Sequence, residues 1–322
     1  MTPEHTNTLI AQDLKQVDNV IRARLDSNVV LIREVANYII GGGGKRLRPA
    51  LVILSAGACG YSGRHHHQLA AVVEFIHTAT LLHDDVVDDS NMRRGKATAN
   101  SAFGNAAAVL VGDFLYSRAF QMMVEIQNMR VMEVLAEATN TIAEGEVMQL
   151  MHVHNADVNE EDYLRVIRAK TAKLFEAAGR LGAIIAGVPE AQETALARYG
   201  MHLGTAFQLI DDILDYSGDL AQTGKNLGDD LAEGKTTLPI IHAMRHGDAR
   251  QADIIRKALV DGGLDDFGLV VEAMKQTGAL DYTRSQAESS ARAARDAVAM
   301  LPDSKYKESL LELATFAVTR KY

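Results

Sequence analysis

Apolar residues recur at helical spacing along almost all of the 322-residue chain, and this pattern constrains the fold most. Val29, Ile32, Val35 and Ile39 are one example, at intervals that place their side chains on one helix face. The period-two alternation of a half-buried strand is hard to find. Only five prolines interrupt the chain. The sequence therefore predicts an all-α protein with one domain over residues 1–322, of which residues 1–7 form a flexible tail.

Composition excludes several classes of protein. A formal net charge of −9 disfavours nucleic-acid binding, which needs a basic surface. No apolar stretch approaches the ~18 residues of a membrane-spanning helix, and the acidic residues Glu4 and Asp13 argue against a signal peptide. The one cysteine, Cys59, cannot form an internal disulfide, which suits a reducing compartment. We expect a cytoplasmic location.

The most informative motif is a triplet of aspartates at the end of an apolar helical run. Asp84, Asp85 and Asp88 lie in the sequence LLHDDVVDD, and one helical turn places Asp84 and Asp88 on the same face. Carboxylates this close repel one another unless protons or cations intervene. Mg²⁺ commonly bridges carboxylates to substrate phosphates. An acidic, solvated helix end is the alternative interpretation of this motif taken alone.

The same spacing returns in a second apolar helix, with Asp211, Asp212 and Asp215. Its neighbours Phe207, Leu209 and Ile210 require burial. Two carboxylate triplets in apolar helices favour a shared cluster of divalent cations over two solvated helix ends.

Basic residues accompany both triplets. They are Lys45 and Arg48 after the glycine run 41–44, Arg93, Arg94 and Lys96 after the first triplet, Lys170 within a helix, and Lys225 and Lys235 after the second triplet. Arginine binds phosphate through a bidentate fork and lysine as a point charge. Each residue alone could be ordinary surface charge, but together they predict a diphosphate pocket.

Other candidate sites are weaker. Glu74 and His77 have the Glu-x-x-His spacing of di-iron bundles, but no second copy is present. His65–His67 could bind metal, although a solvated loop is the favoured interpretation. Cys59 is expected to be a small core residue.

Taken together, these motifs resemble those of the trans-isoprenyl diphosphate synthases, a family of all-α prenyltransferases. The resemblance covers essentially the whole chain, and it implies a helical bundle around a central tunnel. It assigns isopentenyl diphosphate binding to Lys45, Arg48, His77 and Arg94. It assigns allylic diphosphate binding to Arg93, Lys170, Thr171, Gln208, Lys225 and Lys235. The six aspartates of the two triplets are the implied Mg²⁺ ligands and, with Lys170, the implied catalytic residues.

The implied reaction joins isopentenyl diphosphate to an allylic diphosphate such as farnesyl diphosphate. Mg²⁺ and the basic side chains share the charge of the departing diphosphate, and the double bond of isopentenyl diphosphate attacks the allylic cation. No protein nucleophile is needed, in agreement with the absence of a recognisable nucleophile motif.

Product length is expected to depend on residues beneath the first triplet. Ala79 and Thr80 are small where short-chain members of the family tend to have aromatics, so the tunnel would stay open to a long product, with Met123 as a candidate floor. Residues 74–112 and 143–151 most resemble enzymes that make octaprenyl chains for quinones. Heptaprenyl to decaprenyl products remain alternatives. The family resemblance also implies a homodimer, and the apolar product implies transient contact with a membrane surface.

Two other functions are open. A terpene cyclase shares the fold and the first aspartate motif, but Lys45, Arg48 and the second triplet count against it. A regulatory subunit of a heteromeric synthase normally has degraded aspartate motifs, whereas both are intact here.

Overall fold

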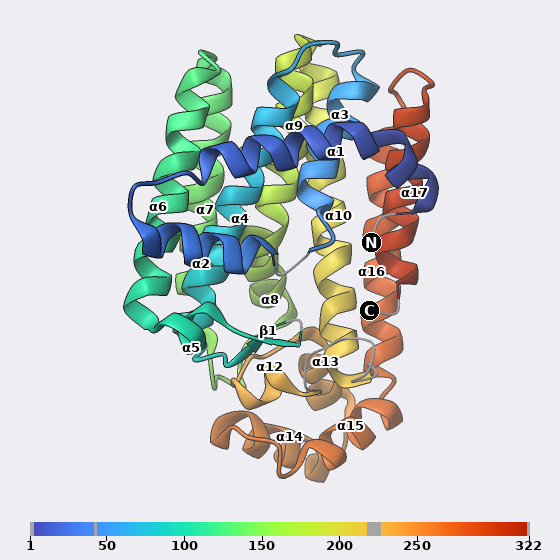
Figure 1. The fold of residues 1–322 in the computed structure, drawn as a ribbon. Helices are drawn as coiled ribbons and strands as arrows, with labels where there is room; N and C mark the ends of the chain where they lie inside the picture. Colours follow the sequence, from blue (N-terminus) through green and yellow to red (C-terminus); the bar gives the residue numbers. More distant parts are fainter. Residues whose placement is uncertain (1–2, 42–43, 94, 218–226, 321–322) are drawn as a thin grey trace. The chain divides into compact units, whose positions relative to one another are not determined.

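A computed structural model describes residues 3–41, 44–93, 95–217 and 227–320, and these are almost entirely helical (Figure 1). The prediction of an all-α protein is confirmed. One antiparallel hairpin interrupts the helices, where Met92 pairs with Ala97 and Arg93 with Lys96. No helix in the described part of the chain is long and apolar enough to cross a bilayer.

The chain divides into two compact units. Unit 1 comprises Met1–Thr139, Leu174–Gly200 and Arg295–Phe316, and unit 2 comprises Asn140–Lys173, Met201–Ala294 and Ala317–Tyr322. The expected single domain over residues 1–322 and its central tunnel stay predictions.

Unit 1 contains the N-terminal helices and the first aspartate triplet. Its complete elements are α1 (Glu4–Arg24), α2 (Val30–Gly41), α3 (Leu47–Ala58), α4 (His65–Val87), β1 (Met92–Arg93), β2 (Lys96–Ala97), α5 (Ala99–Phe103) and α6 (Asn105–Glu125). It also contains most of α9 (Lys173–Ala186) and α17 (Lys305–Thr319) and the first part of both α7 (Met129–His152) and α10 (Glu190–Ser217).

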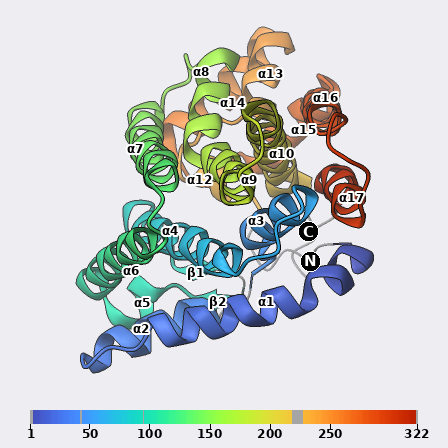
Figure 2. The same cartoon turned by 90° about the horizontal axis from the view of Figure 1, so that it is seen from above.

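Helix α4 is central to unit 1 because it packs against α1, α3 and α6. Figures 1 and 2 show α1 running crosswise over α3 and α4. Leu69, Phe75, Ile76 and Leu82 of α4 are fully buried. Burial of such side chains contributes about 1.5–3 kcal/mol each, so packing fixes the helix that ends in the first triplet.

The N-terminal segment differs from the expected tail. Helix α1 begins at Glu4, so residues 4–7 are helical rather than flexible. Thr6 is buried, and its hydroxyl donates a hydrogen bond to Glu312 at 3.3 Å. The sequence prediction was wrong there because it could not anticipate a partner so distant in the chain.

Unit 2 contains the second triplet. Its remaining elements are α8 (Glu160–Ile167), the π-helical turn η1 (Arg168–Ala172), α12 (Asp229–Ala232), α13 (Leu238–His246), α14 (Ala249–Asp261), α15 (Phe267–Gln276) and most of α16 (Ala279–Ala297). Leu209, Ile210 and Ile213 of α10 pack into an apolar cluster with Tyr163 and Leu238. Leu209 and Ile210 therefore belong to the core, as the sequence indicated, whereas Phe207 is only partly buried.

Candidate active site

The first aspartate triplet lies at the C-terminal end of α4. Asp84 and Asp88 are partly exposed, whereas Asp85 is buried. Asp89 follows with a φ of 49°, in the left-handed region where asparagine and aspartate are enriched. This conformation ends the helix directly after the third carboxylate of the triplet.

The hairpin after α4 brings Arg93 back onto Asp85. Nε and Nη2 of Arg93 donate to Oδ1 of Asp85 at 2.9 and 2.6 Å. The side chain of Asn100 donates to the backbone carbonyl of Asp85 at 3.1 Å. The other carboxylate oxygen of Asp85 is buried and accepts no hydrogen bond from the described residues. A buried acceptor of this kind fits a cation.

Further basic side chains lie along one pocket in unit 1. His77, Arg93 and Lys96 are among the residues that line this pocket. Nη1 of Arg48 is 3.3 Å from Nε2 of His77, which must be the acceptor because arginine only donates. The guanidinium of Arg48 also lies 4.4 Å from the centre of the Phe175 ring. Arg48, His77 and Arg93, predicted from sequence, are thus brought together in one unit.

The backbone before α3 is held by a residue without a predicted role. Arg46 has a left-handed conformation, with a φ of 49°. Its guanidinium pairs with Glu74 at 2.5 Å and lies 3.6 Å from Asp18. These ion pairs stabilise the turn in which the partly exposed Lys45 lies. Arg94 lies outside the described residues.

In unit 2, Asp212 of the second triplet is buried within α10. Its Oδ1 accepts a hydrogen bond from Gln208 at 2.8 Å, and its Oδ2 accepts one from the hydroxyl of Tyr163. Burial and then the charge of Asp230 raise the pKa of Asp212 to about 8, against the opposing effect of these hydrogen bonds. A nearby cation would favour the ionised form of this carboxyl.

The other two aspartates of this triplet have different partners. Asp211 forms an ion pair with Arg320 at 2.8 Å. Oδ2 of Asp215 accepts a hydrogen bond from the backbone N–H of Asp230 at 3.2 Å. Each of the three carboxylates is therefore oriented by a different part of unit 2.

Lys170 lies in the π-helical turn η1 and points toward α7. Its ammonium donates to Gln149 at 2.6 Å and pairs with Glu146 at 2.5 Å. Gly145 of α7 allows the backbone of η1 to lie close to that helix, because a Cβ at Gly145 would lie 2.7 Å from the backbone nitrogen of Lys170. Single π-helical turns are frequent at functional sites.

Thr171, the residue after Lys170, is linked to the second triplet by hydrogen bonds. The hydroxyl of Thr171 donates to Gln208 at 3.1 Å, and Gln208 in turn donates to Asp212. A pocket in unit 2 is lined in part by Gln208, Asp212, Asp230 and Lys235. Lys225 lies outside the described residues.

Several residues of these networks were missed in the sequence. Asn100, Tyr163, Asp230 and Arg320 each bond to a triplet residue. Asp229 and Asp230 offered a signal as an acidic pair soon after Asp215, whereas a buried arginine so near the C-terminus offered none. The expectation that both triplets share cations stays a prediction, because each unit is described by itself.

The candidate chain-length residues are in unit 1. Ala79 in α4 and Met123 in α6 are fully buried, and Thr80 is partly exposed. The hydroxyl of Thr80 donates to the backbone carbonyl of His77 at 2.8 Å. Their role in product length stays a prediction.

Comparison with known proteins decides the family. Residues 29–274 match the model of the family described as polyprenyl synthetase. The chain belongs to the polyprenyl synthetase family. Octaprenyl diphosphate synthase of Escherichia coli is 55% identical to it over 99% of both chains. All-trans-nonaprenyl-diphosphate synthase of Rhodobacter capsulatus is 45% identical over 97% of this chain and 96% of that one.

Solved structures of polyprenyl synthetases agree with this assignment. The polyprenyl synthase of Caulobacter crescentus, crystallised with calcium and isoprenyl diphosphate, has a TM-score of 0.96 and 46% identity, covering 99% of this chain and 98% of that one. A decaprenyl diphosphate synthase of Rhodobacter capsulatus has a TM-score of 0.93 and 46% identity, covering 98% of each chain. The similarity extends well beyond the aspartate motifs.

Proposed function

We propose that the protein is a Mg²⁺-dependent trans-prenyltransferase that condenses isopentenyl diphosphate with an allylic diphosphate to make a long all-trans polyprenyl diphosphate. The observation that carries this proposal is the pairing of carboxylate triplets with cationic side chains in both units. In unit 1, buried Asp85 holds Arg93 at the pocket that also contains His77. Identity of 55% to an octaprenyl diphosphate synthase over almost the full chain supports the same activity.

The residues present fit the divalent cations of this reaction. The proposed ligands are the six carboxylates of Asp84, Asp85, Asp88, Asp211, Asp212 and Asp215. Oxygen donors of this kind suit Mg²⁺, and the buried acceptor atom of Asp85 is compatible with a bound cation. When bound, Mg²⁺ would neutralise charge on the leaving diphosphate.

Isopentenyl diphosphate is assigned to the basic residues of unit 1. Lys45, Arg48, His77 and Arg94 are the proposed ligands of its diphosphate. The contact between Arg48 and His77 supports a joint role, because it holds the guanidinium next to a residue that lines the pocket. A planar guanidinium can bind two phosphate oxygens at once.

The allylic diphosphate is assigned to Arg93, Lys170, Thr171, Gln208, Lys225 and Lys235. The hydrogen bonds that link Thr171, Gln208 and Asp212 support a common role for these three residues. Lys170 is held by Gln149 and Glu146, so its charge is oriented before any substrate binds.

The bond from the allylic carbon to the diphosphate oxygen breaks, and the double bond of isopentenyl diphosphate forms a carbon–carbon bond to the resulting cation. A proton then leaves to the released diphosphate. The chain contributes positioning, charge stabilisation and exclusion of water, so no protein nucleophile takes part.

Octaprenyl diphosphate is the proposed product. Octaprenyl diphosphate synthases of Escherichia coli and Haemophilus influenzae are 55% and 51% identical to the chain. The nonaprenyl and decaprenyl synthases of Rhodobacter capsulatus follow at 45% and 46% identity, so neighbouring lengths are the alternatives. Ala79, Thr80 and Met123 remain the proposed determinants.

We further propose that the protein is a homodimer in the cytoplasm and that its product becomes a quinone side chain. Its contact with a membrane surface would be transient. Val109 and Leu110 of α6 are exposed in the single chain, at 37% and 66%, and support association through this helix.

A single incubation tests the activity. Purified protein receives farnesyl diphosphate, labelled isopentenyl diphosphate and Mg²⁺, with and without EDTA, and the dephosphorylated products are resolved by length. A Mg²⁺-dependent series ending at eight isoprene units is expected. A series ending elsewhere would overturn the octaprenyl assignment alone. A cyclised hydrocarbon would instead indicate a terpene cyclase, and no product from folded protein would favour a regulatory subunit.

A further inference from the structure

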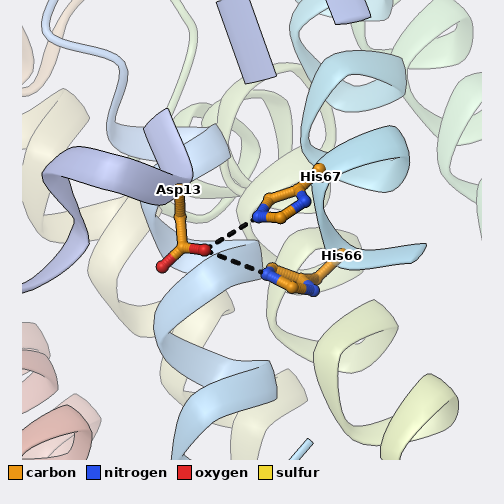
Figure 3. A group of neighbouring side chains, drawn as sticks. All are labelled: Asp13, His66 and His67. Carbon is orange, nitrogen blue, oxygen red and sulfur yellow. Dashed lines mark hydrogen bonds and ion pairs between the residues drawn. The ribbon is translucent and has the colours of Figure 1, made fainter. Parts of the chain in front are cut away.

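Asp13, His66 and His67 form a cluster of side chains that could bind a metal ion, and none of the three lines either pocket (Figure 3). Asp13 lies in α1, and the two histidines lie in the first turn of α4. Nε2 of His67 and Nε2 of His66 are 2.8 and 3.3 Å from the same carboxylate oxygen of Asp13. The solvated loop favoured from the sequence was wrong here, because residues 65–67 are helical and His66 is only 9% exposed.

The spacing of the three donor atoms suits a small transition-metal ion. All three lie within 4.8 Å of one another. A tetrahedral Zn²⁺ site, with bonds of about 2.0–2.1 Å, separates its ligand atoms by about 3.3 Å. The contact between His66 and Asp13 already has this length, and small side-chain rotations would bring His67 into place.

Tyr61 helps to hold the start of α4 and the imidazole of His66 in position. The backbone N–H of His65 donates to the hydroxyl of Tyr61 at 3.3 Å, which anchors the start of α4. The Tyr61 ring meets the His66 ring edge to face, with centroids 5.6 Å apart. Gly63 leaves room for Tyr61, because a Cβ there would lie 2.2 Å from its hydroxyl oxygen. The Tyr61 ring therefore fixes one side of the His66 imidazole.

We propose that Asp13, His66 and His67 bind one Zn²⁺ ion, with water at the fourth position. Two imidazoles and one carboxylate suit zinc, whereas the all-oxygen aspartate triplets suit the harder Mg²⁺. The ion would join α1 to α4, the helix that ends in the first triplet. Its role is structural, and it does not depend on prenyl transfer.

The test is a spectroscopic titration that does not measure activity. Protein stripped with EDTA is titrated with Co²⁺ in excess Mg²⁺, and the intense visible absorption of tetrahedral cobalt is recorded. We expect the unaltered protein to bind one equivalent of Co²⁺. His65→Ala should do the same and serves as the control, because His65 is exposed and lies outside the cluster. His67→Ala and Asp13→Asn should lose the signal, and Zn²⁺ should displace the cobalt where it binds.

Thermal unfolding provides a second measurement with the same variants. Zn²⁺ at about 100 times its dissociation constant should raise the melting temperature by several degrees in the unaltered protein and in His65→Ala. No tetrahedral signal in the unaltered protein would overturn the proposal. An unchanged signal in both His67→Ala and Asp13→Asn would overturn it equally, because the ion would then lie elsewhere.

Discussion

Arg320, close to the C-terminal end of the chain, forms an ion pair with Asp211, the first aspartate of the second triplet, at 2.8 Å. The same guanidinium donates to the backbone carbonyl of Phe207 at 2.6 Å and lies 3.8 Å from the centre of the Phe207 ring. Its side chain is 1% exposed. The end of the chain is therefore attached to the helix that carries the proposed metal ligands of unit 2.

Replacing Arg320 tests this attachment. Arg320→Ala removes the ion pair with Asp211 and the hydrogen bond that the buried guanidinium donates to the Phe207 carbonyl, which together cost about 1–3 kcal/mol. We expect the melting temperature to fall by about 2–6 °C, together with a loss of turnover. Arg284→Ala is the control, because Arg284 is an exposed arginine in the same unit. Equal melting temperatures for the two variants would contradict a structural role for Arg320.

The two neighbouring aspartates of the first triplet should respond differently to substitution. Asp84→Ala removes a partly exposed carboxylate, so the fold should persist while turnover falls by at least about 100-fold. Asp85→Ala leaves the guanidinium of Arg93 without its carboxylate and should also cost about 1–3 kcal/mol of unfolding free energy. Denaturant unfolding and steady-state kinetics of both variants check this difference. A large loss of stability in Asp84→Ala would be inconsistent with it.

A methyl group at Gly145 should disturb the π-helical turn. In Gly145→Ala the new Cβ would meet the backbone nitrogen of Lys170 at 2.7 Å, so the turn or α7 must shift. We expect lower kcat and lower stability. Gly268→Ala is a matched control, because Gly268 also lies in a helix and a Cβ there would have nothing within 4 Å. Its free energy of unfolding should rise by about 0.5–1 kcal/mol. Denaturant unfolding should therefore show a lower free energy of unfolding for Gly145→Ala and a higher one for Gly268→Ala.

Product length should follow the side chains beneath the first triplet. Ala79→Phe is expected to shorten the product, and Met123→Ala to lengthen it, as measured by chromatography of the dephosphorylated products. Both positions are fully buried, so thermal unfolding of each variant must accompany the assay. A folded, active variant with an unchanged product would show that its residue does not limit the chain.

The thiol of Cys59 should react slowly at neutral pH. Burial raises the pKa of Cys59 from 9.0 to about 11, so the reactive thiolate is scarce below that value. The rate of alkylation by iodoacetamide in the folded protein should therefore still rise between pH 9 and pH 11. A rate that levels off near pH 9, as expected for the unfolded chain, would contradict the shift.

Local sequence patterns were sufficient for the fold class and for the proposed ligands. Helical spacing predicted an all-α chain because one face of each helix must be buried, and this depends only on residues a few positions apart. The two triplets were found for the same reason, since each lies within about one helical turn. Arg48, His77 and Arg93 were predicted from motifs, and the structure adds the contact between Arg48 and His77 and the ion pair of Arg93 with Asp85.

Only the tertiary structure decided which distant residues meet. Arg320 reaches Asp211, Tyr163 reaches Asp212, and Asp13 reaches His66 and His67. None of these partners is marked by composition or spacing, because a hydrogen bond or ion pair between helices depends on how the helices pack. The sequence determined helices and carboxylate triplets through local periodicity. Their partners, and hence the orientation of the carboxylates that these partners bind, arise from contacts that form only when the chain has folded.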